Sequence, residues 1–235
     1  MKILFLTNLL PYPLDNGGKI KTFTTLQGLS MAGHCVDLVC FTEDNGHTNN
    51  VPKELTEICS KVEKVFLHLT TTENRKYMMQ IAFKSLFSKY SFGLYKYKSQ
   101  EMLLKLKQLS ENAQYDCIYY DHLQLCVYKS YLDALFPQCK TILDEHNCET
   151  LIIFRNAQNS RNIVKKIFLF LEAYKLRCFE AKCLNSIDVN IVLSQEDYQE
   201  LKKLCKHDFP HEIIPIGVQD RGIKQNMPID GKGLN

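Results

Sequence analysis

The sequence has ten cysteines in 235 residues but no CxxC pair, so their spacing offers no zinc site. The cysteines lie singly, and several fall inside apolar runs, such as Cys40 in VDLVCF and Cys117 in YDCIYY. A disulfide scaffold would need a different pattern in a much smaller secreted protein. The cysteines therefore predict buried, reduced thiols in a cytosolic protein.

Long hydrophobic runs are also lacking. The longest internal stretch, IFLFLEAY at 167–174, is far shorter than the roughly 20 residues that cross a bilayer. The apolar run at the N-terminus ends at Pro11 and has no small-x-small cleavage site, which argues against a secretory signal peptide. We therefore expect a cytoplasmic protein, with at most a peripheral contact at the inner face of the membrane.

A strong charge of one sign is absent as well. The formal net charge is +3, and the 45% hydrophobic and 23% charged residues are typical of a soluble globular protein. Such a balance gives no argument for a nucleic-acid partner, and we expect none. A chain of this length can bury a substantial core.

Short apolar runs alternate with longer segments of helical periodicity. This order predicts an α/β fold: a Rossmann-like, mainly parallel sheet with helices on both faces. Gly33 is expected to end the first helix in a left-handed conformation, and Ser194 to cap a later one. The strands are expected at 2–7, 35–41, 62–69, 116–121, 140–144, 189–193 and 211–216, and helices at 17–32, 98–112, 122–135 and 195–206.

The end of the sequence differs from the rest. Residues 217–235 contain four glycines and one proline and have no periodic apolar pattern. We expect one domain over 1–216, followed by a linker over 217–235 toward a further domain.

One candidate site is the elbow LPYPLDNGGKIKTF at 10–23, where Gly17 and Gly18 stand between a strand and a helix. Glycines there allow a ligand to approach the backbone, and the first helical turn presents free N–H groups to an anion. Lys19 and Lys21 would add positive charge. Alternatively, the glycines only supply the backbone freedom of the turn. The segment is not GxGxxG and no acidic residue ends the second strand, which disfavours a nicotinamide oxidoreductase.

A second candidate is DEHNCE at 144–149, which follows another expected strand. His146 lies among carboxylates where open α/β sheets bind ligands, and Asp144 or Glu149 could hold its tautomer. Alternatively, the block is a polar helix cap, with Asn147 as the capping residue.

Two basic segments are candidates for a surface contact. Residues 161–182 hold six Lys or Arg and two Glu around an apolar centre, and residues 73–98 mix lysines with aromatics. A basic amphipathic helix can lie on anionic lipid. The alternative is a long helix that packs on the sheet and leaves its lysines in solvent.

The stretch LPYPLDNGGKIKTFTTLQGLSMAGHCVDLVCF at 10–41 resembles the opening of GT-B glycosyltransferases of the family-4 type. These begin with a strand, a P-x-P-x-D-x-G-G-like loop, a basic helix and a GH-V turn. DEHNCE resembles the D-x-H-N-x-E block of one branch. Weaker matches are SIDVNIVLSQEDYQEL at 186–201 and EIIPIGV at 212–218, where Ile216 and Gln219 replace the usual Asn and Asp.

The resemblance implies the acceptor-side N-terminal domain of a retaining enzyme, which moves a hexose from a nucleotide sugar to a glycan or lipid-linked acceptor in surface polysaccharide synthesis. It implies no metal and no cofactor beyond the nucleotide-sugar substrate. His146 is the expected catalytic residue, as a polar contact to the sugar. The residues expected to bind donor phosphate or acceptor are Asp15, Gly17, Gly18, Lys19, Asp144, Asn147, Glu149 and Ser194.

The family's second domain carries an E-x7-E motif and a phosphate-binding Arg/Lys pair, and no residue here can be assigned to them. We therefore expect this chain to be inactive alone. The alternative is a non-catalytic module that binds a phosphorylated or glycan ligand, or that docks with a separate donor-binding subunit. The sequence identifies neither the donor sugar nor the acceptor.

Overall fold

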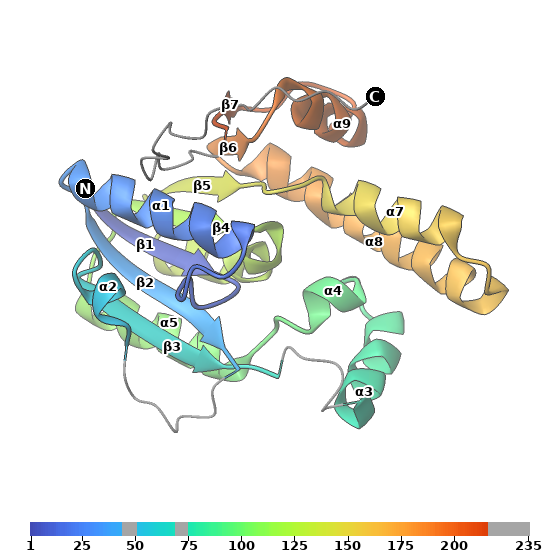
Figure 1. Ribbon diagram of the computed structural model, residues 1–235, viewed down its shortest axis with the longest axis horizontal. Helices are drawn as coiled ribbons and strands as arrows, with labels where there is room; N and C mark the ends of the chain where they lie inside the picture. Colours follow the sequence, from blue (N-terminus) through green and yellow to red (C-terminus); the bar gives the residue numbers. More distant parts are fainter. Residues whose placement is uncertain (44–50, 69–74, 216–235) are drawn as a thin grey trace, which may run out of the picture.

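A seven-stranded parallel sheet forms the centre of the protein in a computed structural model that describes residues 1–43, 51–68 and 75–215 (Figure 1). The strand order is β3-β2-β1-β4-β5-β6-β7. All seven expected strands are confirmed, with shifted ends in several. They are β1 (Lys2–Thr7), β2 (Cys35–Thr42), β3 (Lys61–Phe66), β4 (Cys117–Asp121), β5 (Lys140–Asp144), β6 (Val189–Val192) and β7 (His211–Ile213).

Helices cover both faces of the sheet, as expected. Alternation along β1 sends Ile3 and Phe5 into a core with α1 and α2, while Leu4 and Leu6 enter a larger core with α5, α6, α8 and α9. The helices are α1 (Gly17–Met31), α2 (Lys53–Thr56), α3 (Arg75–Leu86), α4 (Phe92–Tyr95), α5 (Gln100–Asn112), α6 (Lys129–Leu135), α7 (Glu149–Asn159), α8 (Ile163–Ser186) and α9 (Gln195–Cys205).

Several local expectations have clear outcomes. Gly33 has φ +79° after α1, and the Ser194 hydroxyl accepts the N–H of Asp197 at the start of α9, so both caps are confirmed. The cysteines are free thiols, and most are buried. The single helix expected at 122–135 is wrong, because a 3-10 turn, η1 (Leu123–Tyr128), precedes α6. The proposed linker lies outside the described residues.

The strand order creates a switch point between β1 and β4. From β1 the chain continues to β2 and β3 on one side, whereas β4 begins the series that runs outward to β7. Helices on either side of such a point diverge and leave a crevice at the carboxyl ends of the strands. In the sheet register, Thr7 of β1 pairs with Asp121 of β4, and Asp121 pairs with Asp144 of β5. Three polar side chains therefore end neighbouring strands in one row.

A buried carboxylate fastens α7 to α8. Glu180 of α8 is fully buried and accepts the backbone N–H groups of Glu149, at 2.9 Å, and Thr150, at 3.2 Å. The first N–H groups of a helix have no partner within it, so Glu180 acts as a cap supplied by the neighbouring helix. The N-cap residue of α7 is Cys148, which makes no capping bond with its side chain. The alternative role of Asn147 as the cap is therefore wrong.

The state of Glu180 predicts a pH-dependent stability. Burial raises the pKa of Glu180 from 4.5 to about 7. The folded protein then holds this proton more tightly than the unfolded chain, so stability falls as the pH rises from about 4.5 to about 7. Glu180→Gln cannot titrate, and we expect the free energy of unfolding, measured with urea across this window, to fall less than in the parent. The exposed Glu111→Gln should keep the parent slope, and equal slopes in all three proteins would contradict this assignment.

Candidate functional site

A small cavity of about 210 Å³ lies at the switch point. Its walls are the end of β1 at Thr7, the elbow that follows, the first turn of α1 at Gly18 and Lys19, and His122 after β4. The expected glycine elbow therefore borders a real cavity at the carboxyl edge of the sheet, where open α/β folds bind ligands.

The first turn of α1 is prepared for an anion. The Asn16 side chain caps the helix by accepting the N–H of Lys19 at 3.0 Å. Neither Gly17 nor Gly18 has a positive φ. A Cβ built on Gly17 would meet nothing within 4 Å, and one on Gly18 would lie 3.4 Å from the Asn16 oxygen. Neither a special backbone conformation nor tight internal packing therefore requires glycine at positions 17 and 18. The open space in front of the main chain would instead let a ligand approach the backbone closely.

The two lysines of this helix have different partners. The Lys19 ammonium group borders the cavity and forms an ion pair with Asp15 at 2.9 Å. Lys21 is buried and forms an ion pair with Asp144 on the underside of α1. The expectation that Lys21 adds charge to the anion site is wrong, because its side chain is committed to the interior.

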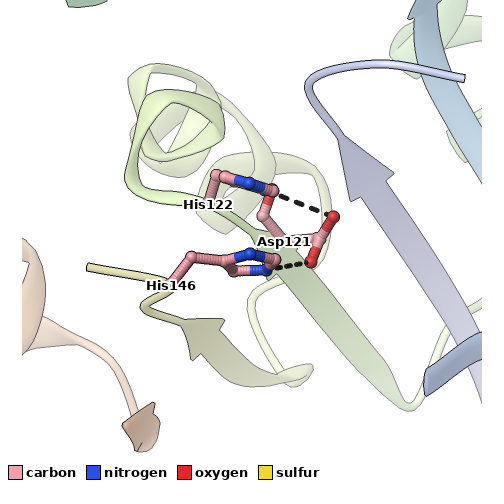
Figure 2. Close-up of side chains that lie close together, drawn as sticks. All are labelled: Asp121, His122 and His146. Atoms are coloured by element: carbon pink, nitrogen blue, oxygen red, sulfur yellow. Dashed lines mark hydrogen bonds and ion pairs between the residues drawn. The ribbon is translucent and has the colours of Figure 1, made fainter. Parts of the chain in front are cut away.

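Asp121 is the centre of the polar cluster beside the cavity (Figure 2). Its fully buried carboxylate accepts the hydroxyls of Thr7 and Thr22, both at 2.7 Å, on one oxygen. The other oxygen lies 2.8 Å from Nε2 of His146, and Nδ1 of His122 lies 3.3 Å from the first. Asp121 thus joins β1, α1 and the segments after β4 and β5. The sequence-based expectation that Asp144 or Glu149 orients His146 is wrong.

The cluster has a defined electrostatic state. Burial alone would raise the pKa of Asp121, but the two histidines outweigh it and hold that pKa well below the ordinary value. For His122, burial alone would lower the pKa. The neighbouring Asp121 carboxylate outweighs burial, and the pKa of His122 is raised. The opposite shifts of the two pKa values mean that each group stabilises the charged form of the other at the wall of the cavity.

His122 is held in an uncommon backbone conformation. Its φ of 94° is rare for a residue with a side chain and costs conformational energy. This conformation turns the ring back over His146, and the ring centres stack 3.7 Å apart. His146 is 9% exposed and lies behind His122, which itself borders the cavity. The glycine elbow and the expected histidine therefore meet at one edge of the sheet, with His122 between them.

The remaining expected site residues lie apart from this cavity. Asp144 is buried and bonds Lys21 and the Tyr119 hydroxyl. Asn147 is exposed, and Ser194 is occupied as the cap of α9. Glu149 borders a separate, mostly apolar cavity of about 270 Å³ between α4, α7 and α8.

Four residues of the polar cluster were not predicted from sequence patterns: Thr7, Thr22, Asp121 and His122. A signal was present, because YYDH at 119–122 ends an expected strand in polar residues, as LDEH does at 143–146. The sequence does not show that β4 lies next to β1 in the sheet, and only this strand order brings these residues together.

Among the described residues, Asp121, His122 and His146 form a group whose ligand atoms lie within 4.8 Å of one another, as a metal site would require. However, both carboxylate oxygens already accept hydrogen bonds from the hydroxyls and from His146. A cation would have to displace these donors and the proton shared with the imidazole. The arrangement suits a hydrogen-bonded ion cluster better than a metal centre.

Comparisons with known proteins give the fold. No known protein family matches the sequence. The chain is 24% identical over 207 residues to an "uncharacterized 44.6 kDa protein in cps region" of Klebsiella pneumoniae, covering 86% of this chain and 48% of that protein. Sucrose-phosphate synthase of Thermosynechococcus elongatus superposes with a TM-score of 0.63 at 15% identity, covering 97% of this chain and 53% of that one.

Phytolacca americana UGT2, solved with UDP-2fluoro-glucose and pterostilbene, superposes with a TM-score of 0.50 at 11% identity, covering 93% of this chain and 53% of that one. The chain thus spans about half the length of each of these three proteins. These likenesses confirm the expected class of fold: a Rossmann-like α/β domain of the kind present in glycosyltransferases.

The ion cluster can be tested through Asp121→Asn. The substitution removes the charge that raises the pKa of His122, so we expect that pKa, followed by NMR titration of the ring, to fall. It should also lower the free energy of unfolding by about 3 kcal/mol, because buried donors and an imidazolium lose their partner. The matched control is Asp37→Asn, a buried carboxylate that accepts the Tyr115 hydroxyl at the other end of the sheet. An unchanged His122 pKa in Asp121→Asn would contradict the pairing.

The engaged ligand atoms also predict the response to metals. A bound ion would stabilise the fold by mass action and raise the thermal unfolding midpoint. Since the ligand atoms are already engaged, treatment with a chelator, followed by Zn²⁺ or Mg²⁺, should leave this midpoint unchanged. A stabilising shift that disappears in His146→Gln would show instead that the cluster binds a metal.

Proposed function

We propose that this chain is the acceptor-side, N-terminal domain of a retaining GT-B glycosyltransferase of the family-4 type. The observation that carries the proposal is the cavity at the switch point, where bare backbone at Gly18 faces His122 across open space. A helix start on one wall and a cationic ring on the other suit a diphosphate and the sugar attached to it.

The proposed reaction moves a hexose from a nucleotide sugar to a glycan or lipid-linked acceptor. The donor's own phosphate would assist the incoming hydroxyl, and positive groups would stabilise the departing diphosphate. On this chain, those groups are the N–H donors of the first turn of α1, the imidazolium of His122 and the ammonium group of Lys19. No metal or further cofactor is part of the proposal.

We assign different roles to the two histidines. His122 borders the cavity and is proposed to contact the sugar or its phosphate. His146 remains a proposed site residue, but as a positioning residue, because its ring supports that of His122 and bonds Asp121. Asp15 is proposed to position Lys19. Glu149 borders the apolar cavity and is proposed to contact the acceptor.

The donor's nucleotide would be bound by a second domain, since the matched proteins are about twice as long as this chain. Synthesis of a surface polysaccharide is the proposed setting, supported by the relative from a cps region. The 235-residue chain by itself is therefore expected not to transfer sugar.

The sharpest test compares two glycines of α1, Gly18 at the cavity and Gly28 two turns or more further along the helix. Gly18→Ala places a methyl group in the cavity, whereas Gly28→Ala places one on the same helix with nothing within 4 Å. Both substitutions should leave the fold intact and α1 no less stable, because alanine favours helices over glycine. In the complete reading frame, Gly18→Ala should lower release of UDP or GDP from the nucleotide sugar by at least about tenfold, and Gly28→Ala should not.

His122→Ala in the same assay should lower kcat by roughly 10²-fold or more, as expected for loss of a charged contact in the transition state.

NMR of the anomeric proton in the product would decide between retention and inversion separately. Full activity of both Gly18→Ala and His122→Ala would remove the proposed site. A binding module would instead bind ligand and release no nucleotide with any donor.

A further inference from the structure

The outer half of α8 exposes an apolar stripe. Ile163, Ile167, Phe170 and Tyr174 recur at helical spacing, and the first, second and last are 67%, 57% and 68% exposed. The solvent face of a helix packed on a sheet is normally polar. Among the described residues no helix is long and apolar enough to cross a membrane, so the stripe does not belong to a bilayer span.

Helix α3 and the residue that follows it carry a second stripe, called the α3 stripe. Met79, Phe83 and Phe87 follow one another at intervals of four residues and are 64%, 63% and 82% exposed. The rings of Phe83 and Phe87 contact each other edge to face, with their centres 5.4 Å apart. Large aromatic side chains that pack mainly on each other in solvent form a patch that is costly to leave in water.

The two stripes belong to one body. The Lys175 ammonium of α8 donates to the carbonyl of Ser85 at 2.7 Å and to that of Leu86 at 3.3 Å, at the end of α3. Just beyond α3, the ring of Tyr90 packs edge to face on Phe179 of α8. In Figure 1, α3 and the outer ends of α7 and α8 project beyond the sheet on the side toward which the strands point. This is the edge at which the cavity opens.

The charges around the stripes are almost entirely of one sign. Residues 76–98 contain no carboxylate, and residues 150–182 contain only Glu172 and Glu180, both buried. The lysines and arginines exposed there are Lys76, Lys84, Lys89, Lys98, Arg155, Arg161, Lys165, Arg177 and Lys182. Exposed apolar rings among cations, without exposed anions, complement a surface of phosphate groups above hydrocarbon.

We propose that the apolar stripes of α3 and α8, with the exposed cations of the same segments, form a docking surface for an anionic lipid bilayer. Phe83, Phe87, Ile163 and Ile167 would enter the boundary between headgroups and acyl chains, and Lys84 and Lys165 would lie at the phosphates. The surface uses parts of both segments that the sequence suggested: α3 from 73–98, and the outer half of α8 from 161–182. The proposal stands independently of the transferase activity, since it uses none of the cavity residues.

The test is sedimentation of the chain with vesicles of phosphatidylcholine alone or mixed with phosphatidylglycerol. We expect binding to the anionic vesicles that weakens with added salt, and little binding to the neutral ones. The double substitutions Phe83→Ser with Ile167→Ser, and Lys84→Glu with Lys165→Glu, should each lower the binding constant by at least about tenfold. Each lysine near an anionic surface is worth roughly fivefold, and each reversal removes more than that.

The matched control is Leu104→Ser with Lys107→Glu, the same types of change at exposed positions of α5. It should bind as the parent does, and all variants should keep the parent's thermal midpoint because the replaced side chains are exposed. Failure of the parent to bind anionic vesicles would overturn the proposal. So would patch variants that bind like the control, or a patch that governs only self-association in gel filtration.

Discussion

The buried carboxylate of Asp121 is the constraint on which the site depends. A fully buried charge is tolerated only when hydrogen-bond donors surround it. The donors to Asp121 come from β1, from α1 and from the segments that follow β4 and β5. The first helix is thereby held at a fixed height over the sheet, because Thr22 must reach the same oxygen as Thr7. The cavity wall at Gly18 and the ring of His122 are consequently positioned by the same group, which links the geometry of the site directly to the stability of the fold.

The helix geometry of α1 explains why its basic residues do not act together. Residues two apart on a helix differ by about 200° in direction. Lys19 therefore faces the cavity while Lys21 turns to the sheet, where Asp144 compensates it. Both cations at the cavity have a counter-charge, since Lys19 pairs with Asp15 and His122 with Asp121, and the start of α1 adds its own positive character. Two buried carboxylates therefore hold α1 on the sheet: Asp121 accepts the Thr22 hydroxyl, and Asp144 pairs with Lys21.

Local patterns predicted the fold well because buried parallel strands appear as short apolar runs, and β1 and β5 were predicted to the residue. The site was predicted only in part. Gly18 and His146 stand beside strand ends that the sequence marks, but their mutual position depends on β4 lying between β1 and β5. That order arises from long-range pairing, such as Thr7 with Asp121, which has no local signature. His122 was missed for the same reason, and because its positive φ interrupts what otherwise looks like the start of a helix.

The exposed apolar stripes lie on the same side of the protein as the candidate site. In Figure 1, α3 and the outer ends of α7 and α8 lie beyond the carboxyl ends of the strands, and the cavity residues Thr7 and His122 stand at the carboxyl ends of β1 and β4. Glu149 borders the apolar cavity between α4, α7 and α8, and it follows His146 by three residues. The apolar cavity therefore lies beside α8, which carries one of the stripes, and close along the chain to His146. Because Glu180 bonds the start of α7 and Lys175 bonds the end of α3, the same long helix holds both of these neighbours at this edge of the sheet.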